Sequence, residues 1–355
     1  MTCKVDKMFC TAPFELLMFG NGGQNWICCP AWLPVSVGKT IKGSLSADWN
    51  SSAAQQIRSS IHDGTFSLCK PTCPHLTKKS GFVKKVSEIQ DPALRMYIEE
   101  KTTMLPSGPK KIYFSHDRTC NLACPSCRNG FIRANEKEQH RLEVLQNDAL
   151  SSFSQSIEEL YVSGDGDPFS SPTLNKLLVE LDPEKYPNLK LIHLHTNAQM
   201  WNEENWKKLS HIHFLVKSAH ISIDAATSAT YRINRPGGSF KRLMRNLEFI
   251  KDIRAKIHIS FVVQQNNYSE MKEFARLGRE ILDFNVIFTH IDNWGNLSSA
   301  EYIKRAVHQA SHPEHHLLVE VLQDPVFNDP RIDLGNLTHL SSYTPSHHAL
   351  SLDFL

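Results

Sequence analysis

Cysteine is absent from residues 128–355, although the 355-residue chain contains nine cysteines. No apolar run approaches the roughly 18 residues that a membrane-spanning helix needs, and the formal net charge is only +2. These absences disfavour a membrane protein and a protein that binds nucleic acid through a strongly basic surface. The first residues also lack the apolar core of a secretory signal. We therefore expect a cytoplasmic protein with neither a membrane nor a nucleic-acid partner.

The nine cysteines fall into two groups along the chain. Six precede residue 80, and the other three form a C-x-x-x-C-x-x-C motif. In a reducing compartment such clustering indicates metal binding or catalysis more often than disulfides. The sequence therefore predicts one or two metal centres built from thiols.

The three-cysteine motif directly follows a predicted strand at residues 111–115. Thiolates select iron–sulfur clusters, zinc or cuprous ions. A four-iron cluster takes four cysteines, so three would leave one iron open. A zinc knuckle and a chance grouping of buried thiols are the alternatives. The predicted metal ligands, which would also be the catalytic residues, are Cys120, Cys124 and Cys127.

Strand and helix patterns alternate regularly after this motif. The predicted strands are 111–115, 158–163, 189–195, 218–223, 257–263 and 284–289. The predicted helices are 141–156, 172–181, 203–209, 240–254, 268–282 and 298–310. Six repeats with apolar, β-rich strands favour a parallel α/β sheet, whereas eight would close a full barrel.

The motif and the repeats together resemble the radical S-adenosylmethionine (SAM) superfamily. The resemblance implies an α/β fold whose core, at residues 110–310, is a partial (β/α)6 TIM-type barrel. A helical connector at 81–109 would precede it and a C-terminal extension at 311–355 would follow. The resemblance further implies a 4Fe-4S cluster whose open iron binds SAM. Reductive cleavage of SAM would give a 5′-deoxyadenosyl radical that abstracts a hydrogen atom from a substrate carbon, with a flavodoxin- or ferredoxin-type reductant as partner.

Polar and glycine residues follow the later predicted strands, at the ends where ligands bind in such sheets. The segment Gly-Asp-Gly-Asp-Pro resembles the GGEP motif of the superfamily, which holds the SAM amino group, although Asp165 replaces a glycine and Asp167 the glutamate. An aromatic residue usually precedes the last cysteine, and here it is Ser126. Helix capping is the alternative role for Asp224. By this resemblance the cofactor-binding residues are Gly164, Asp165, Gly166, Asp167, Asn197, Ser222, Asp224 and Arg235.

The N-terminal cysteines resemble a second element of the same superfamily. Cys10, Gly23 and Cys28 fit the C-x12-G-x4-C spacing of the SPASM or twitch module, which binds an auxiliary four-iron cluster. We therefore expect residues 1–80 to form a small domain with a second, auxiliary 4Fe-4S cluster. Its expected ligands are Cys10, Cys28, Cys69 and Cys73. Cys29 could replace Cys28, and structural zinc is the alternative occupant.

The sequence leaves the reaction and the substrate open. In an oxidoreductase-type reaction, such as dehydrogenation or cross-linking, the substrate radical would lose an electron to the auxiliary cluster. An epimerase would need an unligated cysteine near the substrate as hydrogen donor, and the barrel offers none beyond the motif. The substrate could be a small molecule, a sugar or a peptide. A non-catalytic zinc-binding α/β protein is the alternative from another class.

Overall fold

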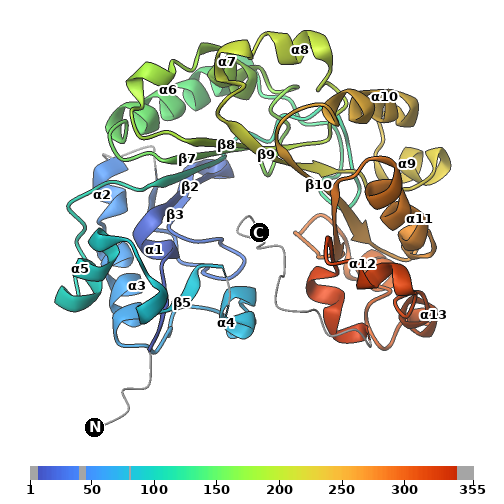
Figure 1. The fold of residues 1–355 in the computed structure, drawn as a ribbon, viewed down its shortest axis with the longest axis horizontal. Coiled ribbons are helices and arrows are strands. Elements are labelled where there is room, and N and C mark those ends of the chain that lie inside the picture. The colour runs from blue at the N-terminus through green and yellow to red at the C-terminus, as the bar shows by residue number, and fades with distance from the viewer. Residues whose placement is uncertain (1–6, 40–44, 80, 342–355) are drawn as a thin grey trace.

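A ten-stranded sheet runs through the computed structural model, which describes residues 7–39, 45–79 and 81–341. Six central strands lie in chain order, and each is parallel to its neighbour. They are β6 (Lys111–Ser115), β7 (Glu159–Val162), β8 (Leu191–Thr196), β9 (Val216–Ser222), β10 (Lys256–Val263) and β11 (Asn285–His290). Figure 1 shows that they form an open arc. The predicted α/β fold with a partial barrel is confirmed.

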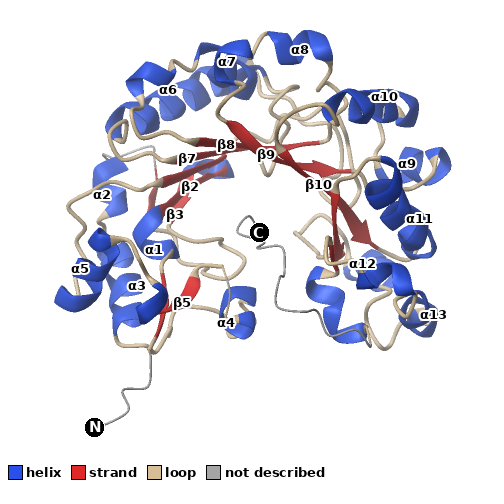
Figure 2. Ribbon diagram, viewed as in Figure 1, coloured by secondary structure: helices blue, strands red, loops and turns tan. Residues whose placement is uncertain are grey.

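Helices connect these strands and cover the outer side of the arc (Figure 2). The helices are α6 (Glu136–Ser152), α7 (Pro172–Glu180), α8 (Glu203–Lys207), α9 (Ser228–Asn234), α10 (Phe240–Ile250) and α11 (Met271–Arg276). The strand residues that face them, such as Ile112, Leu160 and Ile192, are completely buried. Parallel strands need such crossover connections. Among the described residues, no helix has the length and apolar character to cross a membrane.

Strands at both edges extend the sheet beyond the six repeats. β12 (Ile332–Asp333) pairs in parallel with β11, and β2 (Leu16–Gly20) pairs in parallel with β6. β3 (Gln24–Trp26) and β4 (Gly38–Lys39) continue antiparallel from β2. The rings of Phe19 and Phe114 stack across the β2–β6 pair, with 5.6 Å between centroids. The N-terminal segment therefore shares its core with the barrel, while the domain boundaries at residues 80, 109 and 310 stay predictions.

Short helices and a second small sheet complete the N-terminal segment. They are β1 (Met8–Cys10), α1 (Ala12–Glu15), α2 (Leu45–Trp49), α3 (Ser52–His62), α4 (Pro74–Lys78), β5 (Val83–Lys85) and α5 (Pro92–Glu100). β1 and β5 pair antiparallel. After β11 the chain forms α12 (Ser299–Arg305) and α13 (His315–Val321). These elements place the N-terminal cysteines around the start of β2.

Candidate active site

The three cysteines of the motif lie in a loop that leaves the C-terminal end of β6. Cys120 and Cys124 are buried, Cys127 is partly buried, and together with Leu122 they form a small cluster separate from the main core. Neighbouring loops hold this loop in place. Ala123 N donates to the carbonyl of Pro236, between α9 and α10, at 3.0 Å. Asn296 Nδ2, in the loop after β11, donates to the Pro125 carbonyl at 2.8 Å. The structure thus brings the three thiols together, and their role as metal ligands stays a prediction.

Each of these thiols accepts a hydrogen bond from an N–H group. The donors, at 3.3–3.6 Å, are Leu122 and Asn197 for Cys120, Arg235 for Cys124 and Arg128 for Cys127. N–H donors, and cationic ones above all, favour the thiolate. Burial opposes this, because it raises the pKa of Cys120 to about 11 and that of Cys124 above its usual value. The donor set therefore suits sulfurs whose negative charge is offset by bound iron.

Among the described residues, no group of three or more His, Cys, Asp or Glu side chains is arranged to hold a single metal ion. A single zinc ion would need all its sulfurs at about 2.3 Å from one point, whereas each cysteine of a four-iron cluster binds its own iron. The choice between zinc and a cluster at the three thiols stays a prediction.

The glycine loop after β7 packs directly on the cysteine loop. A Cβ atom on Gly166 would lie 2.4 Å from the carbonyl oxygen of Asp117 and 2.7 Å from that of Thr119. A Cβ atom on Gly164 would lie 2.8 Å from Ser115 Oγ. Only glycine allows such close approach of two backbones. The two predicted motifs are therefore in contact.

Asp167 is completely buried, and both of its carboxylate oxygens accept hydrogen bonds. Oδ1 accepts from the backbone N–H groups of Phe169 and Ser170, at 3.0 and 3.1 Å. Oδ2 accepts from Asn197 N at 2.8 Å and Thr196 Oγ1 at 2.7 Å. Burial raises the pKa of Asp167. Its observed contacts join the ends of β7 and β8, and cofactor binding by this residue stays a prediction.

Asp165 links the glycine loop to two other parts of the chain. Its carboxylate accepts a hydrogen bond from Asn21 Nδ2, in the turn after β2, and its carbonyl accepts one from Arg128 Nη2. Burial raises the pKa of the Asp165 carboxyl group. The loop that resembles the SAM amino-group motif is thus fixed to the N-terminal segment and to the cysteine loop.

Asp224 and Arg235 form a buried ion pair after β9. Asp224 Oδ2 lies 2.7 Å from Arg235 Nη2, and the two side chains are 0% and 9% exposed. Asp224 Oδ1 also accepts from Val262 N at 2.8 Å. The Asp224 carbonyl accepts from Asn234 Nδ2 and Asn267 Nδ2, at 2.9 and 3.1 Å. Burial raises the pKa of Asp224, and the Arg235 charge partly counteracts this.

Left-handed backbone recurs at the C-terminal ends of three adjacent strands. Ser163 after β7, Ala198 after β8 and Asp224 after β9 have φ angles of 76°, 55° and 61°. Such conformations cost about 1–3 kcal/mol in a non-glycine residue and gather at ligand sites. The N-cap of α9 is Thr227, so the capping alternative for Asp224 is not observed. Sequence analysis missed this feature, because non-glycine residues give no signal for positive φ.

Histidines and tyrosines of the central strands face away from the outer helices. Tyr113 stacks on Tyr161 with 4.0 Å between centroids, and Tyr161 lies 5.5 Å from His193. One level further along the strands, His195 stacks on His220 at 4.4 Å. These residues alternate with the apolar positions that pack on helices, so they line the inner side of the arc.

The inner histidines are uncharged at neutral pH. Burial lowers the pKa of His195 and His258 to about 4, and those of His193 and His220 well below the usual value. His195 Nε2 shares a hydrogen bond of 3.0 Å with Oγ of Ser222, one of the predicted cofactor-binding residues. The inner side of the arc therefore presents uncharged histidines that can form hydrogen bonds.

Five N-terminal thiols also lie close to one another. Burial raises the pKa of Cys28 well above its usual value, and electrostatic interactions with the other four add to this effect. These four are Cys10, Cys29, Cys69 and Cys73. The backbone N–H of Ala12 donates to the sulfur of Cys10, and those of Ala31 and Trp32 donate to the sulfur of Cys29.

The two sets of cysteines lie at opposite ends of the sheet. Cys120 follows the C-terminal end of β6, to which β2 is parallel. Cys10 precedes β2, and Cys28 follows β3, which runs antiparallel to β2. The auxiliary thiols are therefore a separate group, and their binding of a metal stays a prediction.

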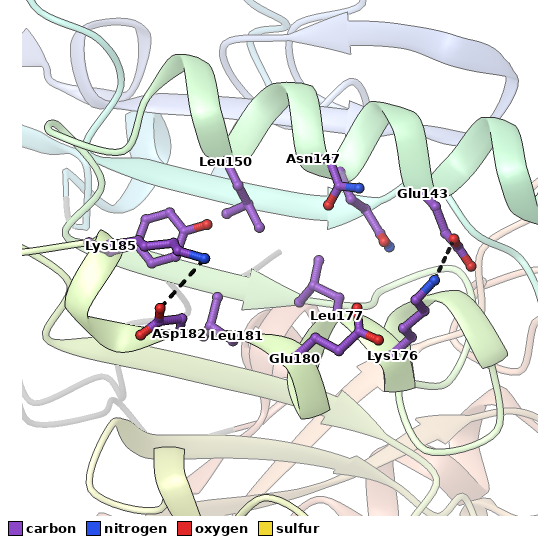
Figure 3. A pocket seen from close by; sticks show the side chains of 11 residues that line it. Glu143, Asn147, Leu150, Lys176, Leu177, Glu180, Leu181, Asp182 and Lys185 are labelled. Atoms are coloured by element: carbon purple, nitrogen blue, oxygen red, sulfur yellow. Dashed lines mark hydrogen bonds and ion pairs between the residues drawn. The ribbon is translucent and has the colours of Figure 1, made fainter.

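A cavity of about 180 Å³ lies away from both thiol groups, on the outer surface between α6 and α7 (Figure 3). Leu150, Leu177 and Leu181 form its apolar floor. The ion pair of Glu143 with Lys176, at 2.8 Å, lies at one side. No cysteine and no strand-end loop contributes to its lining, so the cavity is not part of the candidate site.

Comparisons with known proteins identify the barrel segment. Residues 114–278, a little under half of the chain, match the family model of the radical SAM superfamily. None of the curated proteins matches the chain.

Three solved structures are similar at low identity. SuiB of Streptococcus suis bound to precursor peptide SuiA is 15% identical, with a TM-score of 0.40, over 70% of this chain and 55% of SuiB. The protein anSMEcpe with bound AdoMet and Kp18Cys peptide is 20% identical, with a TM-score of 0.36, over 50% of this chain and 49% of that one. Methylornithine synthase (PylB) is 15% identical, with a TM-score of 0.36, over 51% and 52%. This chain thus spans about half the length of each.

Proposed function

We propose that this chain, whose residues 114–278 match the radical SAM family model, is a radical SAM enzyme. When bound, a 4Fe-4S cluster and SAM would supply a 5′-deoxyadenosyl radical that abstracts a hydrogen atom from a substrate carbon. A flavodoxin- or ferredoxin-type reductant would provide the electron. The observation that carries this proposal is the loop after β6, where three neighbouring thiols each accept an N–H hydrogen bond.

The residues around this loop have distinct proposed roles. Cys120, Cys124 and Cys127 would hold three irons and leave the fourth for SAM. Arg235 would bind the SAM carboxylate, because its Nε atom is buried without an acceptor among the described residues and a guanidinium fork suits a carboxylate. The 164–167 loop, Asn197, Ser222 and Asp224 would contact the remainder of SAM.

The N-terminal thiols would hold an auxiliary 4Fe-4S cluster. Four cysteines complete the ligand set of a closed cluster, and this segment places five close together. The backbone N–H bonds to the sulfurs of Cys10 and Cys29 resemble those expected of metal-bound thiolates, since they favour the charged form. One of Cys28 and Cys29 would remain unligated.

The proposed reaction is of the oxidoreductase type, on a small molecule, a sugar or a peptide. A closed auxiliary cluster cannot bind SAM, so it is suited to accept an electron from the substrate radical. Epimerisation is the second candidate, and it is disfavoured because the spare thiol of the Cys28–Cys29 pair lies at the opposite end of the sheet from Cys120. It would require that thiol to reach the substrate.

The direct test is anaerobic reconstitution with iron and sulfide, followed by incubation with SAM and dithionite. We expect 5′-deoxyadenosine from the wild-type protein and none from a variant with Cys120, Cys124 and Cys127 changed to alanine. A brown protein with absorbance near 400 nm would accompany this. If the fully reconstituted wild-type protein gives no 5′-deoxyadenosine with any reductant, the proposal is wrong. A colourless protein with stoichiometric zinc would support the non-catalytic alternative.

A further inference from the structure

Arg128 follows the last cysteine of the motif, and the residue is 5% exposed. Nε and Nη2 donate to Cys127 Sγ at 3.4 and 3.3 Å, and Nη1 donates to the Arg118 carbonyl at 2.7 Å. Nη2 also donates to the Asp165 carbonyl. Within the described part of the chain, Arg128 forms no ion pair with a carboxylate. Its cationic group is therefore directed at sulfur.

The other buried arginines compensate their charge differently, and one of them, Arg279, pairs with Asp329. Arg58 donates to four oxygen atoms and lies 4.5 Å above the ring of Trp49. Arg235 pairs with Asp224. A buried cation without such compensation is unfavourable. For Arg128 the nearby negative charge is that of the thiolates of the loop, which it contacts directly at Cys127, and that of the Asp165 carboxylate, with which it interacts without a direct ion pair.

We propose that Arg128 is a positioning residue that fixes the Cys127 thiolate and the 164–167 loop as one unit and compensates the negative charge of the bound cluster. This rests on the proposed function. The reduction potential of an iron–sulfur cluster depends on net charge, hydrogen bonds to sulfur and solvent exposure. A buried guanidinium bonded to a ligand sulfur stabilises the more negative, reduced cluster. Its bond to the Asp165 carbonyl fixes the 164–167 loop against the cysteine loop.

The test compares Arg128→Met and Arg128→Lys with Arg133→Met in the reconstituted full-length protein. Arg133 is an exposed control in the same loop. The readouts are iron content, the midpoint potential from an EPR-monitored titration, and the affinity for SAM. In Arg128→Met we expect the equilibrium constant for one-electron reduction to fall about tenfold, or about 59 mV. Arg128→Lys should keep most of the potential, because it keeps the charge, but should bind SAM at least fivefold more weakly, because it loses the fork.

The outcomes separate this inference from the proposed function. If the wild-type protein forms no cluster, the proposed function fails first. A second outcome applies if the wild-type protein forms the cluster. The role of Arg128 is then overturned if both Arg128 variants have the same midpoint potential and the same affinity for SAM as Arg133→Met. Loss of iron from a folded Arg128→Met protein, with retention in Arg133→Met, would support it. Wild-type SAM affinity in Arg128→Lys would overturn the positioning role even if Arg128→Met does not fold.

Discussion

The guanidinium of Arg235 lies against the sulfur of Cys124, with 3.5 Å between Nη1 and Sγ. On its other side it pairs with the buried carboxylate of Asp224. A single side chain thus connects the cysteine loop to the end of β9. This contact joins segments that are 111 residues apart in the chain, and it makes the ion pair part of the site.

Asp224→Asn should therefore destabilise the protein strongly. Removal of one partner from a buried ion pair leaves the other charge uncompensated and typically costs about 3–5 kcal/mol. The measurement is the free energy of unfolding in urea for the metal-free protein. The control is Glu204→Gln, which breaks the exposed ion pair with Lys208 and should cost less than about 1 kcal/mol. Equal effects of the two substitutions would contradict a structural role for the Asp224–Arg235 pair.

The two thiol groups should lose iron independently. Cys124→Ala should remove about one cluster and abolish SAM cleavage, because a ligand of the SAM-binding iron centre is lost. Cys69→Ala should remove the auxiliary cluster and leave part of the cleavage activity. Iron and sulfide analysis, with assay of 5′-deoxyadenosine, measures both effects. The double variant should lose both clusters; complete loss of iron in either single variant would argue against two separate sites.

Gly166→Ala should disturb the contact between the glycine loop and the cysteine loop. The added Cβ atom would lie 2.4 Å from the Asp117 carbonyl oxygen, so the two loops must move apart. Overpacking of this kind costs roughly 1–3 kcal/mol. Gly130→Ala is the matched control, because nothing lies within 4 Å of a Cβ atom there. We expect a lower melting temperature and poorer cluster incorporation in Gly166→Ala only, and unchanged incorporation would count against the contact.

The inner histidines should make stability fall on acidification. Burial lowers the pKa of His195 and His258 from 6.5 to about 4. Between these values the unfolded chain binds protons that the folded protein does not, so stability falls as the pH decreases from about 6.5 to about 4. At pH 5 each histidine should contribute on the order of 1–2 kcal/mol to this loss.

The measurement is the free energy of unfolding at pH 7.5 and at pH 5, for the wild-type protein and for the double variant His195→Gln/His258→Gln. The quantity compared is the change in this free energy between the two pH values. The buried carboxyl groups of Asp165 and Asp167 have raised pKa values and act in the opposite direction, so the absolute slope is not informative. The double variant should lose less stability on acidification than wild type. His140→Gln, at an exposed position, should follow the wild type, and identical pH dependence in all three proteins would refute the prediction.

Local patterns explain the part of the fold that sequence analysis predicted. The strand before the motif was predicted at 111–115 and is observed there as β6, because apolar, β-branched and aromatic residues of a buried parallel strand form a continuous run. The helix predicted at 141–156 is observed as α6 at Glu136–Ser152, because it begins after the cap Asn135, which the sequence analysis did not use. Strands β2 and β12 were not predicted as members of the sheet, because the sequence of a short segment does not indicate which strand it pairs with.

The sequence by itself determined the spacing of the thiols, the order of the strands and the glycines that permit close backbone contact, because these depend on neighbours along the chain. The tertiary structure alone decided which charges meet. It placed Arg128 against Cys127 and Asp165, bound both oxygens of Asp167 within the protein, and turned Ser163, Ala198 and Asp224 into left-handed conformations. Such contacts join residues from different strands, and their energies depend on burial, which exists only after the sheet and its loops have packed.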